Sequence, residues 1–502
     1  MTLAATLSLA FCAFIQNDAT SITIYSAAQP GGVQPELYRP SAYANPYSKP
    51  KVPGFALVRQ DRELEFTKNR SEIRLSDVAA EIDPTTVLFT SLTDPATTRV
   101  LEQSFQFDIV DSTRLLDKYR DKKVIVERGV GAAVSSITGI LLSPGPGPLI
   151  VKTENGTVIL QQYNAVHLAD STGELLTKPT LVWDVETAKP GKHQTRVSYQ
   201  TEGITWWADY NLIFTEGANA NAGTVDVAAW VSILNQSGAT YPNAKLKLIA
   251  GDVNRVQPEM QTWDARRSMS KLQAAGEAGG FEEKSFFEYH LYTLQRPTTI
   301  PDRSTRQMEL FPSAHGVPCE KVLVYRGIDD SFGSYYSSPM IDREFMAQGN
   351  KKINIYLKFK NTKASGMGMP LPTGRMRVSK LDPADGSLEF IGEDSIDHTP
   401  KDEPVLIRLG EAFDVVGART QANFKIDTVR HQIDEDIEIS IRNHKAEDVK
   451  VFIRESLYRW KNWEIKKSSH EYTKTDSRNI EIPITIPKDG EVKVKFSVHY
   501  NW

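Results

Sequence analysis

Residues 195–214, TRVSYQTEGITWWADYNLIF, decide the fold class of this chain. Apolar and polar side chains alternate along them, which is typical of half-buried antiparallel strands. The same pattern continues, strand after strand, from Leu181 to Arg255. Half of the eight tryptophans lie in this block: Trp183, Trp206, Trp207 and Trp230. Since one aromatic residue buries about 150–250 Å², we expect the block to form the core of a sandwich.

Strand-like alternation extends outward from this block toward both ends of the chain. It is present upstream in residues 55–75, FALVRQDRELEFTKNRSEIRL, and resumes downstream at residues 286–294, FFEYHLYTL. Residues 413–502 repeat it in segments such as DIEISIRNH and EVKVKFSVHY. Regularly spaced strands separated by turns are typical of immunoglobulin-like sandwiches. We therefore predict a mainly β protein with several antiparallel β-sandwich units and few helices.

Residues 105–178 depart from this pattern. The segment 112–123, STRLLDKYRDKK, predicts one short helix, and short strands and turns follow it. Asn155-Gly156 between two apolar runs predicts a hairpin with a type I′ turn, which needs positive φ at both central positions. We predict a small inserted β-barrel for this region.

The chain has 502 residues, a length that suggests about three domains. Proline-rich residues 22–54 predict a short strand followed by an extended arm, and residues 257–285 predict a mobile loop or a loosely held helix. The predicted order is a signal peptide at 1–21, an N-terminal arm and β-domain at 22–104, the inserted barrel at 105–178, a central β-sandwich region at 179–256 and 286–412 interrupted by the loop at 257–285, and a C-terminal immunoglobulin-like β-sandwich at 413–502.

The first apolar stretch, residues 3–15, favours export. LAATLSLAFCAFI has the length of the apolar region of a signal peptide and is too short to cross a bilayer core of about 30 Å. Cleavage is expected before about residue 22, and bulky Phe11 before Cys12 disfavours a lipoprotein. The mature chain would hold only Cys319 and no transmembrane segment. A periplasmic or extracellular, envelope-associated protein is predicted.

Charge and motifs exclude several classes of function. Lys and Arg number 59 against 63 Asp and Glu, so no basic excess exists for a run of phosphates, and nucleic acid is not an expected partner. None of the nine histidines has HExxH spacing, and no nucleophile elbow, Walker loop or dinucleotide fingerprint occurs in a strand-to-helix context. We predict no catalytic residues, no metal site and no cofactor.

The densest polar cluster is GEDSIDHTPKDE, residues 392–403. Carboxylates beside a histidine suit an acid/base pair or a cation site, and the relevant side chains are Glu393, Asp394, Asp397, His398, Asp402 and Glu403. The favoured alternative is a solvated turn in which Asp397 or Thr399 hydrogen-bonds to local backbone. Asp394, Asp397 and His398 are kept as candidate binding residues.

The second candidate surface combines WWADY with the later GDVNR. Its members are Trp206, Trp207, Asp209, Tyr210, Asp252, Asn254 and Arg255. Adjacent residues of a strand point to opposite faces, so one of the paired tryptophans must meet a second layer, another domain or a ligand. The favoured hypothesis is an interdomain contact in which Arg255 pairs with Asp209 or Asp252. The alternative is a platform on which sugar rings stack.

Several long blocks of sequence resemble one bacterial family. Residues 195–214 and 230–256, together with FFEYHLYTLQRPTTIPDRSTRQMELF at 286–311, residues 371–417 and YRWKNWEI at 458–465, are similar to exported proteins of the domain of unknown function 4139 family. The resemblance covers most of residues 22–502 and implies export, but it implies no activity. Some relatives are labelled mucoidy inhibitors, mainly those with a helical N-terminal part, which this sequence lacks.

The sequence leaves two hypotheses for function. The first is a non-enzymatic envelope protein that interacts with or supports an unidentified envelope protein or glycan. The second is a carbohydrate-binding or carbohydrate-hydrolysing protein with acids drawn from Glu393, Asp394 or Asp397. A glycosidase requires two carboxyl groups about 5–9.5 Å apart in a cleft. Converging carboxylates beside tryptophan would favour the second hypothesis.

Overall fold

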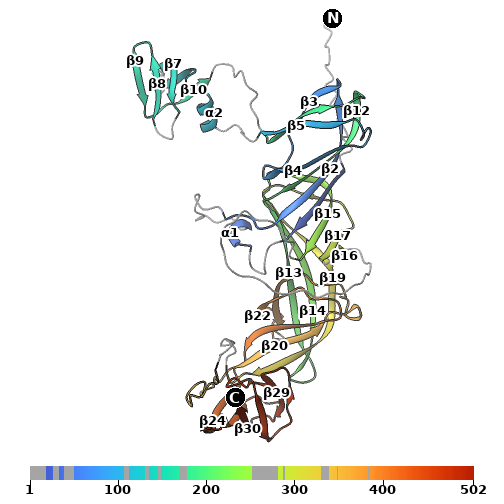
Figure 1. The fold of residues 1–502 in the computed structure, drawn as a ribbon, viewed down its shortest axis with the longest axis vertical. Coiled ribbons are helices and arrows are strands. Elements are labelled where there is room, and N and C mark those ends of the chain that lie inside the picture. The colour runs from blue at the N-terminus through green and yellow to red at the C-terminus, as the bar shows by residue number, and fades with distance from the viewer. Residues whose placement is uncertain are drawn as a thin grey trace.

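The computed structural model describes residues 19–26, 33–38, 50–106, 112–129, 135–144, 148–168, 178–251, 281–286, 289–328, 338–347, 349–382 and 384–502. Within them lie thirty β-strands and two short α-helices. Most of the strands form an elongated body, and the inserted strands with α2 stand to one side of it (Figure 1). The predicted mainly β class, rich in antiparallel sheets, is confirmed. No helix in the described part of the chain is long and apolar enough to cross a membrane.

The first sheet has β1 at its centre. Its strands are β16 (Phe281–Phe286), β17 (Tyr289–Leu294), β15 (Tyr241–Ala250), β1 (Ala19–Tyr25), β2 (Phe55–Phe66), β12 (Gly191–Thr201) and β4 (Ile82–Ser91), in that order, with β18 (Thr298–Ile300) paired to β15. β1 runs parallel to β15 and antiparallel to β2. Ile22 and Ile24 are fully buried while their neighbours are not, which is the period of two expected of a strand.

A second, larger sheet forms the middle of the molecule. Its main order is β22 (Leu388–Ile396), β21 (Gly374–Leu381), β13 (Ile204–Glu216), β14 (Ala222–Asn235), β19 (Ser304–Tyr325), β26 (Val449–Ser456), β29 (Asn479–Ile486) and β28 (Thr473–Lys474), and β19 also pairs with β20 (Ile353–Lys360), which pairs with β23 (Pro404–Glu411). The 22-residue β19 is long enough to join both parts of this sheet. One hydrophobic cluster runs from Ile22 of the first sheet to Ile407 of the second.

A three-stranded sheet covers the same core. It consists of β3 (Arg70–Leu75), β11 (Thr180–Glu186) and β5 (Arg99–Gln106). Trp183 of β11 is completely buried and belongs to the shared cluster, where its ring meets the edge of Phe89. Strands from residues 22–104 and 179–256 therefore contribute to one core.

The inserted region is an open sheet and not the predicted barrel. Its order is β10 (Ala165–Leu168), β6 (Lys123–Arg128), β7 (Ser135–Ser143), β8 (Leu149–Thr153) and β9 (Gly156–Leu160), and within the described residues its two edge strands do not pair. The predicted helix is present as α2 (Ser112–Lys118). Leu115, Leu116 and Tyr119 cover one face of the sheet. Five short strands with a helix over one face bury their core without closing the sheet (Figure 1).

The hairpin between β8 and β9 forms as predicted, but its turn differs. Thr153 pairs with Gly156, so Glu154 and Asn155 are the two turn residues. Positive φ is confined to Gly156, at 123°, and the type I′ prediction was therefore wrong. The prediction required positive φ at both central residues of the turn. In the structure the positive φ is instead adopted by Gly156, the first residue after the turn, where glycine has no steric penalty.

The C-terminal residues form a sandwich that shares a layer with the second sheet. One layer is β24 (Val415–Asp427), β25 (Gln432–Asn443), β30 (Glu491–Asn501) and β27 (Trp463–Ser468). The opposing layer is β26, β29 and β28, which joins the second sheet where β26 pairs in parallel with β19. A second hydrophobic cluster fills the space between the layers and reaches Tyr325 at the end of β19.

Two predictions meet the limits of the described residues. Residues 252–280, most of the predicted loop at 257–285, lie outside them. The last residues of that prediction, 281–285, belong to β16, so the loop was placed too far toward the C-terminus. At the other end of the chain, residues 1–18 also lie outside the described part, and β1 begins at Ala19, within the predicted signal peptide.

Candidate functional site

The paired tryptophans point to opposite faces of β13, as their spacing predicts. Trp206 is 1% exposed in the shared core, where its indole Nε1 donates a hydrogen bond of 3.2 Å to the carbonyl oxygen of Ile249. Its ring lies edge-on to Tyr292, with 6.2 Å between the ring centroids. Trp206 is therefore a structural residue that ties the second sheet to β15 and β17 of the first.

Trp207 is half-buried on the other face, beneath a short segment of the predicted arm. That segment, residues 33–38, contains α1 (Pro35–Tyr38). Tyr38 lies over Trp207 with 5.4 Å between ring centroids, and Val33 and Val52 complete a small apolar cluster with Leu234. The indole Nε1 of Trp207 donates a 2.7 Å hydrogen bond to Asp209. Trp207 thus anchors the arm to β13.

Asp209 lies at the centre of a line of charges across three strands. The parallel pairing of β13 with β21 sets Asp209 beside Arg375, and Asn211 beside Arg377. The Asp209 carboxylate is 3.3 Å from Nη1 of Arg377 and 3.6 Å from Nε of Arg375. Arg377 Nε is in turn 3.6 Å from Glu393 of β22. The Asp209 side chain is only 10% exposed, and the two nearby guanidinium groups offset the cost of burying a carboxylate.

An exposed aromatic ring completes this surface. Trp230 of β14 pairs with Asp209 in the β13–β14 ladder and is 37% exposed. We refer to Trp207, Asp209, Trp230, Arg375 and Arg377 as the β13 face. The β13 face therefore combines two indoles, one carboxylate and two guanidinium groups.

The predicted partner of Asp209 is not observed in the described residues. Asp252, Asn254 and Arg255 lie outside them, so the proposed pairing with Arg255 falls outside the described structure. The arginines that do contact Asp209 come from GRMRV, residues 374–378, and sequence reasoning missed them. Their alternation in that segment was a signal, but only the β13–β21 pairing places both beside Asp209.

Tyr210 lies in the core and not on the β13 face. It is fully buried, and its hydroxyl donates a 2.8 Å hydrogen bond to the carbonyl oxygen of Pro372. Burial raises the pKa of Tyr210 well above its usual value, because the phenolate would lose its hydration. The hydroxyl therefore stays protonated and fastens β13 to the segment before β21.

Asp394 joins two strands that form no ladder. β22 and β23 approach each other, and within the described residues β22 is paired only with β21. Asp394 Oδ2 accepts a 2.7 Å hydrogen bond from the backbone N–H of Arg408 on β23, and Oδ1 accepts one of 2.8 Å from the N–H of Ser395. The side chain thus replaces the missing backbone pairing at this seam.

The remaining members of the acidic cluster lie on a strand and a turn. Glu393 and Asp394 are neighbours in β22 and so point to opposite faces. Thr399 Oγ1 donates to the carbonyl oxygen of Asp397, as the turn hypothesis predicts, and His398 Nδ1 accepts a 3.1 Å hydrogen bond from the N–H of Thr373. The structure therefore distributes these groups over the strand and turn and does not bring Glu393 and Asp394 to one face.

Other groups capable of chemistry also have structural environments. Burial raises the pKa of Cys319 to about 11, which keeps this thiol neutral near pH 7. His193 is 2% exposed and lies 3.0 Å from Ser91 Oγ and 2.7 Å from the carbonyl oxygen of Lys189. No group of three or more His, Cys, Asp or Glu in the described part of the chain is placed to hold a metal ion.

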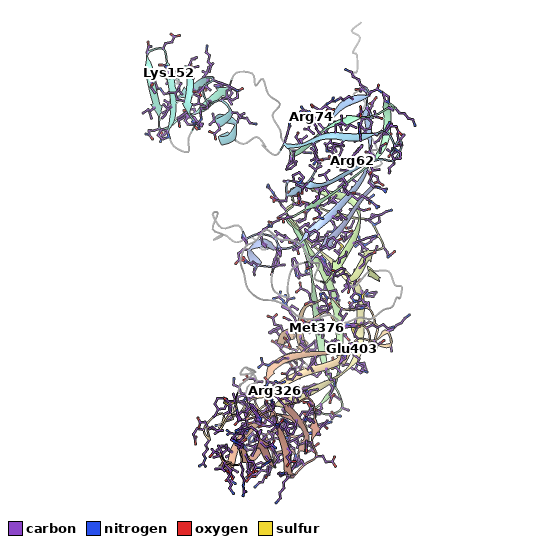
Figure 2. The ribbon with its side chains drawn as sticks, viewed as in Figure 1. Arg62, Arg74, Lys152, Arg326, Met376 and Glu403 are labelled. Atoms are coloured by element: carbon purple, nitrogen blue, oxygen red, sulfur yellow. The ribbon has the colours of Figure 1, made fainter. Side chains whose placement is uncertain are left out.

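Sequence reasoning also missed a second polar site. A cleft of about 710 Å³ lies beside the end of β19, the start of β20 and the end of β23. Its lining includes Arg326, Lys352, Arg408 and Glu411. Figure 2 labels Arg326 at this junction between the middle of the molecule and the C-terminal sandwich. Its lining residues come from three separate segments, and only the fold brings them together.

Comparisons with protein-family models, with curated proteins and with solved structures found no match to this chain. The resemblance to the domain of unknown function 4139 family therefore stays a prediction.

Proposed function

We propose that this chain is an exported protein of the bacterial cell envelope that acts by interaction or structural support and not by catalysis. The main support is that the polar groups singled out in the sequence form hydrogen bonds and ion pairs within the fold. Both carboxylate oxygens of Asp394 accept backbone hydrogen bonds at the β22–β23 seam. Asp209 is held between two arginines, and the hydroxyl of Tyr210 is used within the core. A general base needs a reachable proton and a suitable pKa, whereas these groups serve the fold.

Export is supported by the apolar run at residues 3–15 and by the start of the folded region. β1 begins at Ala19 and pairs with β15 and β2. Its second residue, Thr20, is buried, with only 4% of its surface exposed. A signal peptidase must therefore cut at or before this point if the central strand of the first sheet is to stay whole. We expect the mature N-terminus at or before Ala19, and not as late as residue 22.

Cell fractionation followed by N-terminal sequencing tests this proposal. The full chain, expressed with a C-terminal tag in a diderm bacterium, is expected in the periplasmic or extracellular fraction with residues before the mature start removed. Uncleaved chain confined to the cytoplasm would contradict export. A mature start inside β1, after Ile22, would contradict the role assigned here to that strand.

Interaction as the mode of action needs its own test. Chemical cross-linking of the tagged chain in intact envelopes, followed by mass spectrometry, is expected to yield one recurrent partner whose cross-links fall on one face. Replacing Trp230 by Ala is expected to reduce those cross-links if the β13 face is the contact. Tyr472→Ala is the matched control, because Tyr472 is a similarly exposed aromatic residue at 40%. An absence of recurrent cross-links from wild type would contradict the proposal.

A carbohydrate-binding role is the second candidate, and Trp230 is the observation that favours it. An exposed indole beside charged groups can stack on a sugar ring while the charges bind its hydroxyls or carboxylates. Retention on envelope polysaccharide is expected to fall with Trp230→Ala and to persist with Tyr472→Ala if this role holds. Equal retention of wild type and both variants would remove it.

A further inference from the structure

The cleft at the end of β19 has walls of different kinds. Its floor is the outer surface of β20 and β23, from which Asn354, Tyr356, Arg408 and Glu411 project. The opposite wall follows the chain just after β19, where Arg326 lies, and Lys352 stands before β20. At about 710 Å³, the cleft falls within the range of 300–1,000 Å³ typical of small-molecule sites.

Asn350 holds the walls of this cleft in place. Its backbone N–H donates to the carbonyl oxygen of Gly327 at 2.9 Å, and its carbonyl oxygen accepts from the hydroxyl of Tyr325 at 2.7 Å. Its side-chain amide donates to the carbonyl oxygen of Arg326 and accepts from the N–H of Lys352. Asn350 therefore links the end of β19 to the start of β20. Because this link holds the lining groups in position before a ligand binds, it lowers the entropic cost of binding.

The cleft is positively charged within an acidic chain. Among the described residues that line the cleft, Arg326, Lys352 and Arg408 contribute three positive charges and Glu411 contributes one negative charge, a net charge of +2, whereas the whole chain carries −4. Lys352 Nζ is 2.9 Å from Glu411, which satisfies that carboxylate. Glu411 is therefore neutralised by Lys352, and Arg408 keeps a positive charge that this pair does not balance.

Arg408 has donors that point beyond its protein contacts. Its Nε donates a 2.9 Å hydrogen bond to Asn354 Oδ1, which orients the guanidinium plane. Its Nη2 is 3.7 Å from Glu411, which is beyond hydrogen-bonding distance. The Arg408 side chain is 50% exposed, so the terminal nitrogens can turn toward an incoming acceptor. Paired guanidinium donors match the two oxygens of a carboxylate or phosphate.

We propose that this cleft binds an anionic group, a carboxylate or a phosphate, carried on a small polar ligand. Arg408 supplies the main positive charge, Lys352 adds a second cation by exchanging its contact with Glu411 for the ligand, and Tyr356 provides a ring beside which a sugar or similar polar body lies. Glu411 opposes the ligand, since its negative charge repels an anionic group placed near Lys352. The site is separate from the β13 face and does not depend on the proposed location of the protein.

Isothermal titration calorimetry of the purified full chain tests the site. The probes are inorganic pyrophosphate and a trimer of galacturonate, with maltotriose as a neutral sugar of matched size. We expect at least one anionic probe to bind, maltotriose not to bind, and added salt to weaken binding. Binding of pyrophosphate alone identifies a phosphate ligand, and binding of the uronate trimer alone identifies a carboxylate ligand.

Three variants assign the binding to this cleft. Arg408→Gln is expected to weaken the anionic probe by about tenfold or more, because a charge-assisted, two-pronged hydrogen bond is lost. Lys352→Gln is expected to weaken it less. Glu411→Gln is expected to strengthen it by about two- to fivefold, because it removes a like charge and frees Lys352. An increase in affinity is a result that a damaged fold would not produce.

Lys192→Gln is the matched control. Lys192 is 65% exposed and paired with Glu63 at 2.8 Å, much as Lys352 is 67% exposed and paired with Glu411, but it lies on β12 of the first sheet. Its affinity for the probe is expected to equal that of wild type. The proposal is overturned if neither anionic probe binds wild type, if maltotriose binds as well as they do, or if Glu411→Gln and Lys352→Gln leave the affinity unchanged.

Discussion

In the C-terminal sandwich the side chains of Arg459 and Glu435 are 0% and 1% exposed, whereas on the β13 face those of Arg375 and Arg377 are 29% and 32% exposed beside Asp209. Both regions pair an arginine with a carboxylate. Deep burial makes the first pair part of the core, and breaking it leaves a charge without water. The arginines of the shallower group keep access to solvent, although Asp209 itself is 10% exposed. This difference indicates that the charged groups of the β13 face, and not the buried pair, are accessible to a ligand or partner.

Buried arginine in the C-terminal sandwich also holds a separate segment of chain. Arg459 Nη1 donates to the carbonyl oxygens of Met340 and Asp342, at 3.0 and 2.8 Å, and its guanidinium lies 4.5 Å from the ring centroid of Phe424. Nearby, Arg419 pairs with Glu455 at 2.7 Å and donates to the carbonyl oxygen of Met346. Residues 338–347 are therefore fastened to the sandwich by two arginines.

Arg459→Ala is expected to have the largest effect and tests the buried side of this comparison. It removes the cation that balances Glu435, which then keeps its hydrogen bond from Gln421, and it removes the donor for two carbonyl groups. We therefore expect the free energy of unfolding to fall by about 4–5 kcal/mol, the upper part of the range for a broken buried pair. Urea unfolding monitored by tryptophan fluorescence measures it.

The double variant Arg419→Met with Glu455→Leu is the control, since removing both buried charges together is often close to neutral. A loss below about 1 kcal/mol for Arg459→Ala would show that burial does not separate the two regions.

The second largest effect is expected at the paired tryptophans, where substitutions on the two faces of β13 should reduce stability by different amounts. Trp206→Ala should lower the free energy of unfolding by about 3–4 kcal/mol, because it leaves a cavity in the shared core. Trp207→Ala should cost about 1–2 kcal/mol, because that ring is half-buried and packs mainly on the arm. Urea midpoints of the two single variants measure the difference. Equal losses for the two variants would contradict the difference in burial between the two faces of β13.

Asp209→Asn sharpens the comparison on the exposed side. The isosteric amide still accepts a hydrogen bond from Trp207, but the attraction to Arg375 and Arg377 is lost. We expect a decrease of about 1 kcal/mol or less in the free energy of unfolding, as for partly solvated pairs. Glu435→Gln, the same change in the buried region, should cost several times more. Similar losses at the two positions would contradict the proposed difference in burial.

Acid titration should give the smallest effect. Arg196 lowers the pKa of Asp61 through their hydrogen bonds. A carboxyl group with a lowered folded-state pKa adds stability above its unfolded pKa of about 3.9 and loses it as the pH falls through the lower folded value. This pair is solvent-screened, so we expect less than about 1 kcal/mol. Denaturant midpoints between about pH 5 and pH 2 should fall slightly less for Asp61→Asn than for wild type.

Local pattern determined the secondary structure. The alternation in residues 195–214 predicts β12 and β13, since buried and solvated faces impose a period of two on each strand. The same rule placed Trp206 and Trp207 on opposite faces. The helix at residues 112–123 and the hairpin at Asn155-Gly156 were also visible as local signals, and both form. No local signal showed whether the inserted sheet closes into a barrel, because closure depends on whether two distant edge strands pair.

Only the tertiary structure decided which distant residues meet. The parallel pairing of β13 with β21 brings Arg375 and Arg377 to Asp209, although more than 160 residues separate them along the chain. The seam that Asp394 bridges and the cleft at Arg326 likewise arise where separate strands converge. Side-chain period is a property of neighbouring residues and is written in the sequence. Pairing partners follow from how the whole chain buries its apolar faces, and that balance of many distant contacts cannot be derived from any one segment.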